Sequence, residues 1–129
     1  VLVFGCAYRT DLLYADYFES LDEEYDNFHY LPRVSREDRR ADGSKKYVQT
    51  TLWDDAELLD PIMEQDNSLM YICGLKGMES GIYRALAKKG LTEYLDVREP
   101  ASGKTPDEWD ERDLKRYVKP SSRTFVEVY

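Results

Sequence analysis

The stretch LMYICGLKGMESGIYRALAKKG, residues Leu69–Gly90, decides the fold of this 129-residue chain. Its first five residues predict a buried β-strand, the chain turns at Gly74, and residues 76–90 carry apolar side chains at helical spacing. A strand that passes through glycine into a helix is typical of open α/β sheets, which usually bind ligands at the carboxyl ends of their strands. The thiol of Cys73 and the bare backbone of Gly74 lie at that end.

Strand-like and helix-like segments alternate along the rest of the chain. Further strands are predicted over residues 1–7, 28–35 and 124–129, and further helices over residues 10–25, 48–67 and 106–118. Thr10 or Asp11 can cap the first of these helices. Pro61 either kinks the second helix or starts a new one, with Asp60 as its N-cap. The alternation predicts one α/β domain, a three-layer Rossmann-like parallel sheet with helices on both faces.

Composition narrows the class of protein. The chain is 42% hydrophobic and 34% charged, which is typical of a soluble globular domain, and it has no run of about 18 apolar residues that would predict a membrane span. Its net charge of −8 argues against a nucleic-acid partner. His29 is the single histidine, too few for a histidine-based metal site, so no metal is expected. Cys6 and Cys73 are expected to be free thiols in a reducing compartment, with a disulfide as the alternative.

Five motifs in chain order carry a resemblance to a known family. They are LVFGCAYRT at residues 2–10, VSRE at 34–37, DGSKKYVQT at 42–50, YICGLKGM at 71–78 and VEVY at 126–129. Together they resemble the NADP-binding C-terminal domain of plant-type ferredoxin–NADP(+) reductases, within the wider family that includes cytochrome P450 reductase. The resemblance covers nearly the whole chain. It implies that residues 1–129 are a truncated NADP-binding domain of a longer flavoenzyme, whose FAD-binding barrel and glycine-rich loop lie upstream.

The second and third motifs bear on the 2′-phosphate of NADP. That group carries about −1.5 to −2 charges near neutral pH, by analogy with other phosphomonoesters. Arginine can bind it through a fork of donors, lysine as a point charge and serine through its hydroxyl, while a tyrosine ring can stack on adenine. The resemblance assigns the phosphate contacts to Ser35, Arg36 and Lys45. It assigns stacking on adenine to Tyr47 and a contact to ribose or adenine to Gln49. The alternative is a solvated charged loop, which is what we expect of Arg39, Arg40 and Lys46.

The fourth motif bears on the nicotinamide. A glycine after a strand lets a flat cofactor approach the backbone, which a Cβ would block. In the family resembled, the cysteine of this motif lies beside the nicotinamide, near the point where hydride passes to flavin N5. Cys73 would shape that pocket without acting as a nucleophile, and Leu75 and Met78 would be wall and packing residues. The alternative for Cys73 is a small buried hydrophobe at a strand end.

The first motif supplies the end of the first predicted strand. The resemblance places Gly5 and Cys6 on the pyrophosphate and nicotinamide side of the cofactor. The family often has proline where this chain has Ala7, and Arg9 is unusual there. Arg9 could meet a phosphate or simply face solvent.

The terminal motif bears most directly on mechanism. In plant-type reductases the final tyrosine stacks on the flavin ring, where the nicotinamide must later sit. Tyr129 would therefore be a gate, and Glu127 would tune the flavin potential or pass protons. With Cys73, these residues are the catalytic candidates. The alternative is an ordinary edge strand with alternating side chains.

The resemblance implies an FAD-dependent ferredoxin–NADP(+) reductase-like oxidoreductase. It would transfer hydride between FAD and NADP and exchange single electrons with ferredoxin or flavodoxin, in the cytoplasm or the plastid stroma. The fragment alone is expected to be inactive and to hold no FAD. One alternative is the reductase module of a diflavin or oxygenase-coupled system. Another is a non-catalytic NADP-binding sensor, against which Tyr129 argues because a sensor has no flavin to shield.

Overall fold

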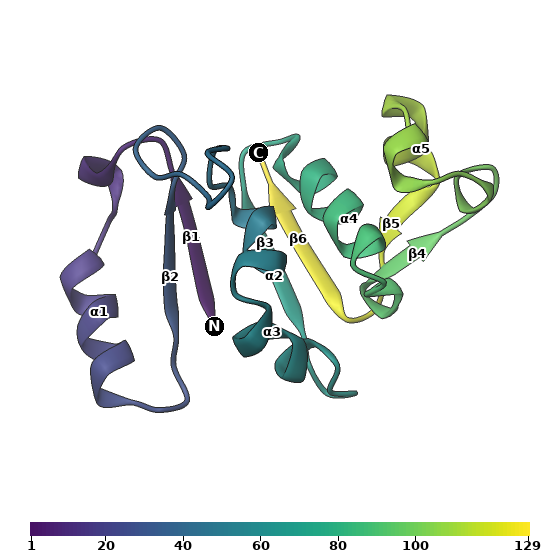
Figure 1. Cartoon of the computed structure of the whole chain (residues 1–129). Helices are drawn as coiled ribbons and strands as arrows, with labels where there is room; N and C mark the ends of the chain where they lie inside the picture. Colours follow the sequence, from purple (N-terminus) through teal and green to yellow (C-terminus); the bar gives the residue numbers. More distant parts are fainter. The chain divides into compact units, whose positions relative to one another are not determined.

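A computed structural model of the protein describes all residues from Val1 to Tyr129. The chain forms two compact units, Val1–Asp54 (unit 1) and Asp55–Tyr129 (unit 2). Each unit contains one pair of parallel strands with helices beside it, so the predicted small α/β fold with parallel strands is confirmed (Figure 1). Hydrogen bonds join the strands in two-stranded sheets.

Unit 1 is built on two parallel strands joined by a helix. Strand β1 is Leu2–Cys6, helix α1 is Ala15–Glu24 and strand β2 is Tyr30–Val34. The strands pair in register from Leu2 with Tyr30 to Cys6 with Val34. A connection that joins parallel strands needs a crossover of this kind. The ring of Phe18 on α1 lies 5.4 Å from the ring of Tyr30, so aromatic contacts hold the helix against the sheet.

The predicted start of the first helix is wrong. Residues Arg9–Asp11 form a separate 3₁₀ turn, η1, and α1 begins after Tyr14, which has φ of 56°. A residue in the left-handed conformation cannot continue a right-handed helix, so the chain must restart at Ala15. Asp11 accepts a hydrogen bond from the backbone N–H of Tyr8 and therefore belongs to the preceding turn.

The helix predicted over residues 48–67 is also divided. The structure has a 3₁₀ turn η2 at Val48–Thr50, helix α2 at Thr51–Asp54 and helix α3 at Ala56–Met63. The break falls at Asp55, which has φ of −121° and ψ of 35° and so leaves the helical conformation. Pro61 lies inside α3, and Asp60 is part of that helix and not a cap. The alternative in which Pro61 starts a new helix with Asp60 as its N-cap is therefore wrong.

Unit 2 contains the strand–glycine–helix stretch that the sequence predicts. Strand β3 is Met70–Gly74 and pairs in parallel with the last strand, β6, at Thr124–Val128. Helix α4 is Met78–Lys88, and it ends with Gly90 at φ of 80°. The backbone N–H groups of Gly90 and Leu91 donate to the carbonyls of Ala87 and Leu86 at 3.1 Å and 2.9 Å. This pair of bonds is a Schellman motif, which confirms Gly90 as the helix-ending residue.

A small antiparallel lobe, which the sequence did not predict, follows α4 and precedes β6 along the chain. Strand β4 is Leu95–Val97, strand β5 is Val118–Pro120 and helix α5 is Glu111–Arg116. Three 3₁₀ turns complete it: η3 at Thr92–Tyr94, η4 at Ala101–Gly103 and η5 at Pro106–Glu108. The buried indole of Trp109 donates to the carbonyl of Ala101 at 2.9 Å, and Arg84 of α4 donates to the carbonyls of Pro106 and Trp109.

The helix predicted over residues 106–118 therefore begins later than expected. Asp110 caps α5 by accepting the backbone N–H of Asp113 at 2.8 Å, and Asp113 accepts the backbone N–H of Asp110 in return. Such a reciprocal cap satisfies two donors that a helix start leaves free.

No helix of the chain is both long and apolar enough to cross a membrane. Both cysteines are free, so the disulfide alternative is wrong.

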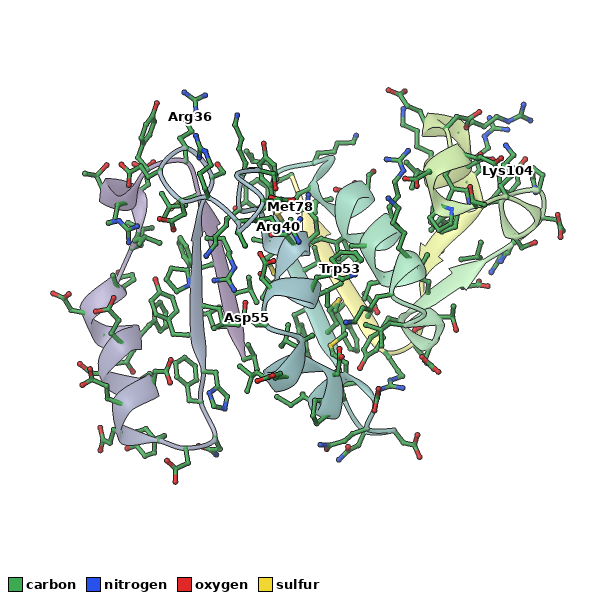
Figure 2. All side chains as sticks on the ribbon, in the orientation of Figure 1. Arg36, Arg40, Trp53, Asp55, Met78 and Lys104 are labelled. Carbon is green, nitrogen blue, oxygen red and sulfur yellow. The ribbon has the colours of Figure 1, made fainter.

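One ion pair fixes the start of α5. The carboxylate of Asp113 is almost fully buried, and the ammonium of Lys104 lies 2.8 Å from it. Figure 2 labels Lys104. The hydrogen bond from Lys104 lowers the pKa of Asp113 below its ordinary value of 3.8, and the same bond raises the pKa of Lys104 above 10.5. Stability from the pair is therefore present above the carboxyl's unfolded pKa and is lost as pH falls through its lower folded pKa. At high pH the loss begins only as pH rises beyond the ordinary lysine value toward the raised folded pKa.

We predict that Asp113→Asn lowers the melting temperature at about pH 7, because it removes the ion pair. As pH falls below about 4 the difference from the unchanged protein should start to shrink, because the unfolded carboxyl then takes up a proton, and it should vanish only once pH has fallen through the lowered pKa of Asp113 in the folded protein. Thermal unfolding followed by circular dichroism across this range tests it. Glu111→Gln is the matched control, because the pair of Glu111 with Lys115 is exposed and 3.7 Å long. Melting curves that stay equally far apart at all pH values would contradict the role of the charge.

Candidate functional site

The loops that follow β1 and β2 are held together by backbone hydrogen bonds. Beyond the paired strands, the N–H of Ser35 donates to the carbonyl of Cys6 at 2.9 Å, and the N–H of Arg36 donates to that of Ala7 at 3.1 Å. The hydroxyl of Ser35 also donates to the carbonyl of Cys6 at 3.3 Å. The predicted phosphate residues Ser35 and Arg36 therefore start a loop whose backbone is fixed against the end of β1.

Arg36 is exposed and forms no salt bridge. Its Nη1 donates to the hydroxyl of Tyr8 at 2.9 Å, and its Cζ lies 5.4 Å from the centre of the Tyr8 ring. Arginine has five N–H donors, so most of them remain available to an anion. Figure 2 shows Arg36 at one end of unit 1. No sequence pattern pointed to Tyr8, because its contact with Arg36 depends on the register of the two strands.

Arg9 contacts two carboxylates, and its side chain is 60% exposed. Its Nη2 lies 2.6 Å from Oδ1 of Asp38, and its backbone N–H donates to Oε2 of Glu37 at 3.0 Å. These contacts join the loop after β1 to the loop after β2. Arg9 therefore balances the two carboxylates that follow Arg36 in the sequence.

The loop after β2 carries the other cations of unit 1. Lys45 and Lys46 form no salt bridge, and Arg39 donates only to backbone carbonyls, those of Ser35 and Asp38. Arg40 differs from our expectation of a solvated charge, because its Nε lies 3.0 Å from Oδ1 of Asp54. The arginine and lysine side chains of unit 1 without a carboxylate partner therefore gather on this loop: Arg36, Arg39, Lys45 and Lys46.

The remaining residues assigned to the cofactor in unit 1 lie close by in the chain. Tyr47 comes directly before η2 and its side chain is exposed, so its ring can receive a stacking partner. Gln49 lies within η2 and is partly buried. The thiol of Cys6 donates to the carbonyl of Tyr8 at 3.2 Å, and burial, followed by the charge of Asp11, raises the pKa of this thiol. Cys6 therefore stays protonated near neutral pH.

Gly5 has a packing reason to be glycine. A Cβ at this position would lie 2.5 Å from Cγ1 of Val48, closer than real carbon contacts allow. The absent side chain makes room for η2 against β1. This contact explains the residue type without a cofactor, so the assignment of Gly5 to the pyrophosphate stays a prediction.

In unit 2, the fourth and fifth motifs meet at the carboxyl ends of β3 and β6. Cys73 is the register partner of Glu127. The backbone N–H of Tyr129 donates to the carbonyl of Gly74 at 3.1 Å, and the N–H of Lys76 donates to the carbonyl of Tyr129 at 3.0 Å. The structure thus brings the three catalytic candidates and the glycine turn to one edge of this strand pair.

The side chains at this edge are open to solvent. Cys73 is exposed, so the alternative of a small buried hydrophobe is wrong. Tyr71 lies two residues before Cys73 and hence on the same face of β3. Its ring stacks on that of Phe125 of β6, with 4.9 Å between centres, and Leu75 and Tyr129 are 73% and 80% exposed. A flat aromatic group would therefore meet little steric obstruction here.

Gly74 combines a backbone constraint with a packing constraint. Its φ is 151°, and a Cβ would lie 2.8 Å from Cε of Met78 (Figure 2). Met78, the first residue of α4, thus packs over the glycine as expected of a packing residue. The close approach that we expected of a cofactor is made, on this side of Gly74, by a methionine methyl group.

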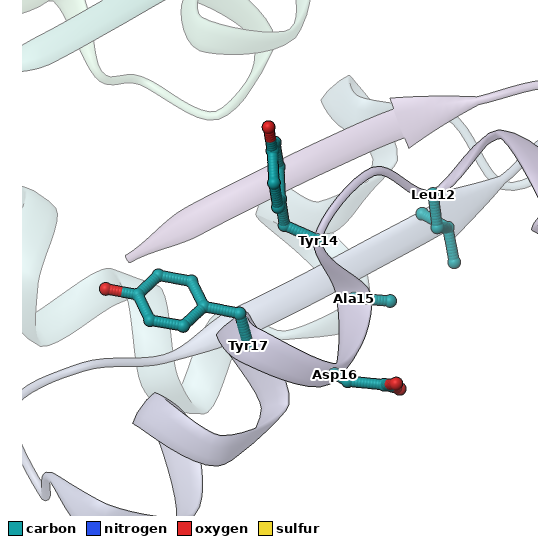
Figure 3. A pocket seen from close by; sticks show the side chains of 5 residues that line it. All are labelled: Leu12, Tyr14, Ala15, Asp16 and Tyr17. Atoms are coloured by element: carbon teal, nitrogen blue, oxygen red, sulfur yellow. The ribbon is translucent and has the colours of Figure 1, made fainter.

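A shallow pocket at the start of α1 is a poor site for a phosphorylated ligand (Figure 3). It is lined by Leu12, Tyr14, Ala15, Asp16 and Tyr17. Its single charged side chain is a carboxylate, which would repel phosphate. The basic loop after β2 is therefore the better anion site in unit 1.

Each unit thus has a parallel strand pair with a distinctive loop at its carboxyl end, a basic loop in unit 1 and a glycine turn in unit 2. Residues 1–84 match the family model described as the oxidoreductase NAD-binding domain, and the chain belongs to this family.

The chain is also similar to ferredoxin–NADP reductases. It is 33% identical to that of Thermosynechococcus vestitus, covering 99% of this chain and 30% of the relative. Identity is 36% to the chloroplastic leaf isozyme 1 of Arabidopsis thaliana and 35% to the chloroplastic enzyme of Spinacia oleracea, each over 99% of this chain. The chain spans about a third of the length of these curated relatives. The family resemblance seen in the motifs is thereby confirmed.

We predict that Gly74→Ala lowers the free energy of unfolding by about 1–3 kcal/mol, because alanine is strained at this φ and meets Met78. Urea denaturation measures the change. Met78→Ala in the same background should restore only part of the loss, since it relieves the contact but not the backbone strain. Gly103→Ala is the control, because the nearest atom there would be an ordinary 3.5 Å from the new Cβ. Full recovery in the double variant would show that packing alone requires glycine.

Proposed function

We propose that this chain is the NADP(H)-binding, C-terminal part of an FAD-dependent ferredoxin–NADP(+) reductase. The whole enzyme would move hydride between FAD and NADP and exchange single electrons with ferredoxin or flavodoxin. Membership of the oxidoreductase NAD-binding family and the names of the relatives support this proposal. A three-layer Rossmann-like sheet and a cytoplasmic or stromal location belong to the same proposal, and the chloroplastic relatives are compatible with the latter.

The observation that carries the proposal is the set of cations without carboxylate partners on the loop after β2. NADP differs from NAD only by the 2′-phosphate, so groups that prefer NADP must meet that phosphate. Arg36 offers several free N–H donors and Lys45 a point charge. In a chain of net charge −8, residues 35–47 hold five cations against three carboxylates, which is a local excess of positive charge. Tyr47, next to this loop, can stack on adenine.

Unit 2 supplies residues suited to the nicotinamide end. Bound NADP supplies or accepts the hydride, which is chemistry that no protein side chain provides. Cys73 and the backbone of Gly74 would contact the ring and fix its orientation. The carboxylate of Glu127, at the register position of Cys73, can hold or release a proton at its exposed oxygens. Leu75 would form part of the wall.

The fit of Tyr129 to a flavin rests on its geometry. Its backbone is bonded to Gly74 and Lys76, while its ring is 80% exposed. A ring presented on a fixed backbone can stack on another flat group at little cost in conformational entropy. This arrangement favours the reductase over a non-catalytic sensor.

We predict that Arg36→Ala weakens NADP⁺ binding about tenfold to a hundredfold and leaves NAD⁺ binding nearly unchanged. The estimate follows from about 1.5–3 kcal/mol for a charge-assisted hydrogen bond. Tyr47→Ala should weaken both cofactors, because adenine is common to them. Equilibrium titrations of the two cofactors measure the effects, with Arg112→Ala on α5 as a control for loss of one exposed charge. Equal losses of the two cofactors in Arg36→Ala would mean that Arg36 is only a solvated charge.

We predict that Tyr129→Ser tightens NAD⁺ binding in the flavin-containing enzyme, because it removes the ring that competes with nicotinamide for the flavin face. Difference spectra of the flavin during NAD⁺ titration report the binding directly. Tyr25→Ser is the control, since Tyr25 is an exposed tyrosine at the end of α1 to which the proposal gives no role. An unchanged NAD⁺ affinity in Tyr129→Ser would exclude the stacked gate.

A further inference from the structure

Two side chains from the loop after β1 contact the loop after β2 at the proposed phosphate site. We propose that Tyr8 and Arg9 are positioning residues that set the preference for a 2′-phosphate. Tyr8 orients the guanidinium of Arg36, and Arg9 neutralises the carboxylates of Glu37 and Asp38 beside it. The inference rests on the proposed function, because it gives these residues a role toward the same phosphate.

The backbone places Tyr8 and Arg36 next to each other. Arg36 donates its N–H to the carbonyl of Ala7, the residue before Tyr8. Tyr8 is itself held by Asp11: its N–H donates to Oδ2 of Asp11 at 3.2 Å, and the N–H of Asp11 donates to the carbonyl of Tyr8 at 2.9 Å. Both partners therefore extend from a fixed backbone, and their contact does not depend on a mobile loop tip.

The side-chain contact limits where the guanidinium can point. The hydroxyl of Tyr8 accepts from Nη1 at 2.9 Å, and the ring lies near the guanidinium carbon. A free arginine side chain must give up rotamer freedom when it binds a phosphate, and prior ordering removes part of that cost. Because the tyrosine uses one of the five N–H donors, it orders the Arg36 side chain and leaves the other donors available to a phosphate. Tyr8 thus differs from a carboxylate partner, which would compete with the phosphate.

Arg9 acts through charge. Glu37 and Asp38 directly follow Arg36, and two free carboxylates at this place would repel a dianionic phosphate. The Arg9 guanidinium pairs with both of them, with 2.6 Å between Nη2 and Oδ1 of Asp38 and 3.7 Å between Nε and Oε2 of Glu37. The side chain of Asp38 is only 26% exposed, so water screens its charge incompletely. Removal of Arg9 would leave that charge uncompensated.

The test measures binding of NADP⁺, NAD⁺ and 2′-AMP by equilibrium titration at low and high salt. Tyr8→Phe keeps the ring and removes the hydroxyl acceptor, and it should weaken NADP⁺ and 2′-AMP about threefold to tenfold, with NAD⁺ nearly unchanged. Arg9→Ala should weaken the same two ligands by about threefold at low salt and less at high salt. Arg9→Lys keeps the charge and should recover most of that loss. Tyr17→Phe, another exposed tyrosine, is the control.

A double variant tests whether Tyr8 acts through Arg36. If it does, Tyr8→Phe added to Arg36→Ala causes no further loss of NADP⁺ affinity, because the residue to be oriented is gone. Additive losses would overturn the positioning role. So would losses that are equal for NADP⁺ and NAD⁺ in Tyr8→Phe and Arg9→Ala, which would indicate a structural role alone.

The single variant Arg36→Ala separates failure of this inference from failure of the proposed function. If Arg36→Ala discriminates between NADP⁺ and NAD⁺ while the Tyr8 and Arg9 variants do not, the phosphate site stands and the positioning role is wrong. If Arg36→Ala does not discriminate either, the phosphate assignment itself fails. Should Arg9→Ala unfold, Arg9→Lys and Tyr8→Phe decide the question, because each keeps most of the native contacts.

Discussion

Parallel pairing of short strands is the constraint on which the candidate residues of each unit depend. In a parallel pair the carboxyl ends of the two strands lie at the same edge, so residues distant in sequence become neighbours. In unit 1 the pairing of Cys6 with Val34 leads directly to the contact between Tyr8 and Arg36. In unit 2 the pairing of Gly74 with Val128 leads to the bonds around Tyr129. A shift of either register by one residue would reverse the faces and separate these groups.

The sequence predicted those features that depend on local chemistry. The strand ending at Gly74, the helix after it and its end at Gly90 all follow from apolar spacing and from the conformational freedom of glycine. The motifs also predicted the family, because they combine several unusual local patterns in one order. The helix starts at Ala15 and Ala56 were missed, since they depend on the backbone conformation of Tyr14 and Asp55, which no residue type dictates there.

The site was predictable in residue type but not in contacts. Ser35, Arg36 and Lys45 were recognisable because phosphate requires donors and positive charge. The ion pairs of Arg9 with Asp38 and of Arg40 with Asp54 were not, because each partner comes from a different element and charged residues in loops look alike in sequence. Which cations remain free is therefore a property of the fold. The small lobe of β4 and β5 was missed for a similar reason, since strands of three residues carry too short a pattern to recognise.

The short length of helix α5 has a consequence for local unfolding in unit 2. Its six residues are too few to form a stable helix in isolation, so its order comes from its surroundings. Those surroundings are the buried ion pair with Lys104 and the bonds from Arg84 to the carbonyls of Pro106 and Trp109. Loss of any one of these anchors would expose the others to water. Residues 98–119 should thus exchange their amide hydrogens as one cooperative segment, with a common opening free energy below that of the β3–β6 pair.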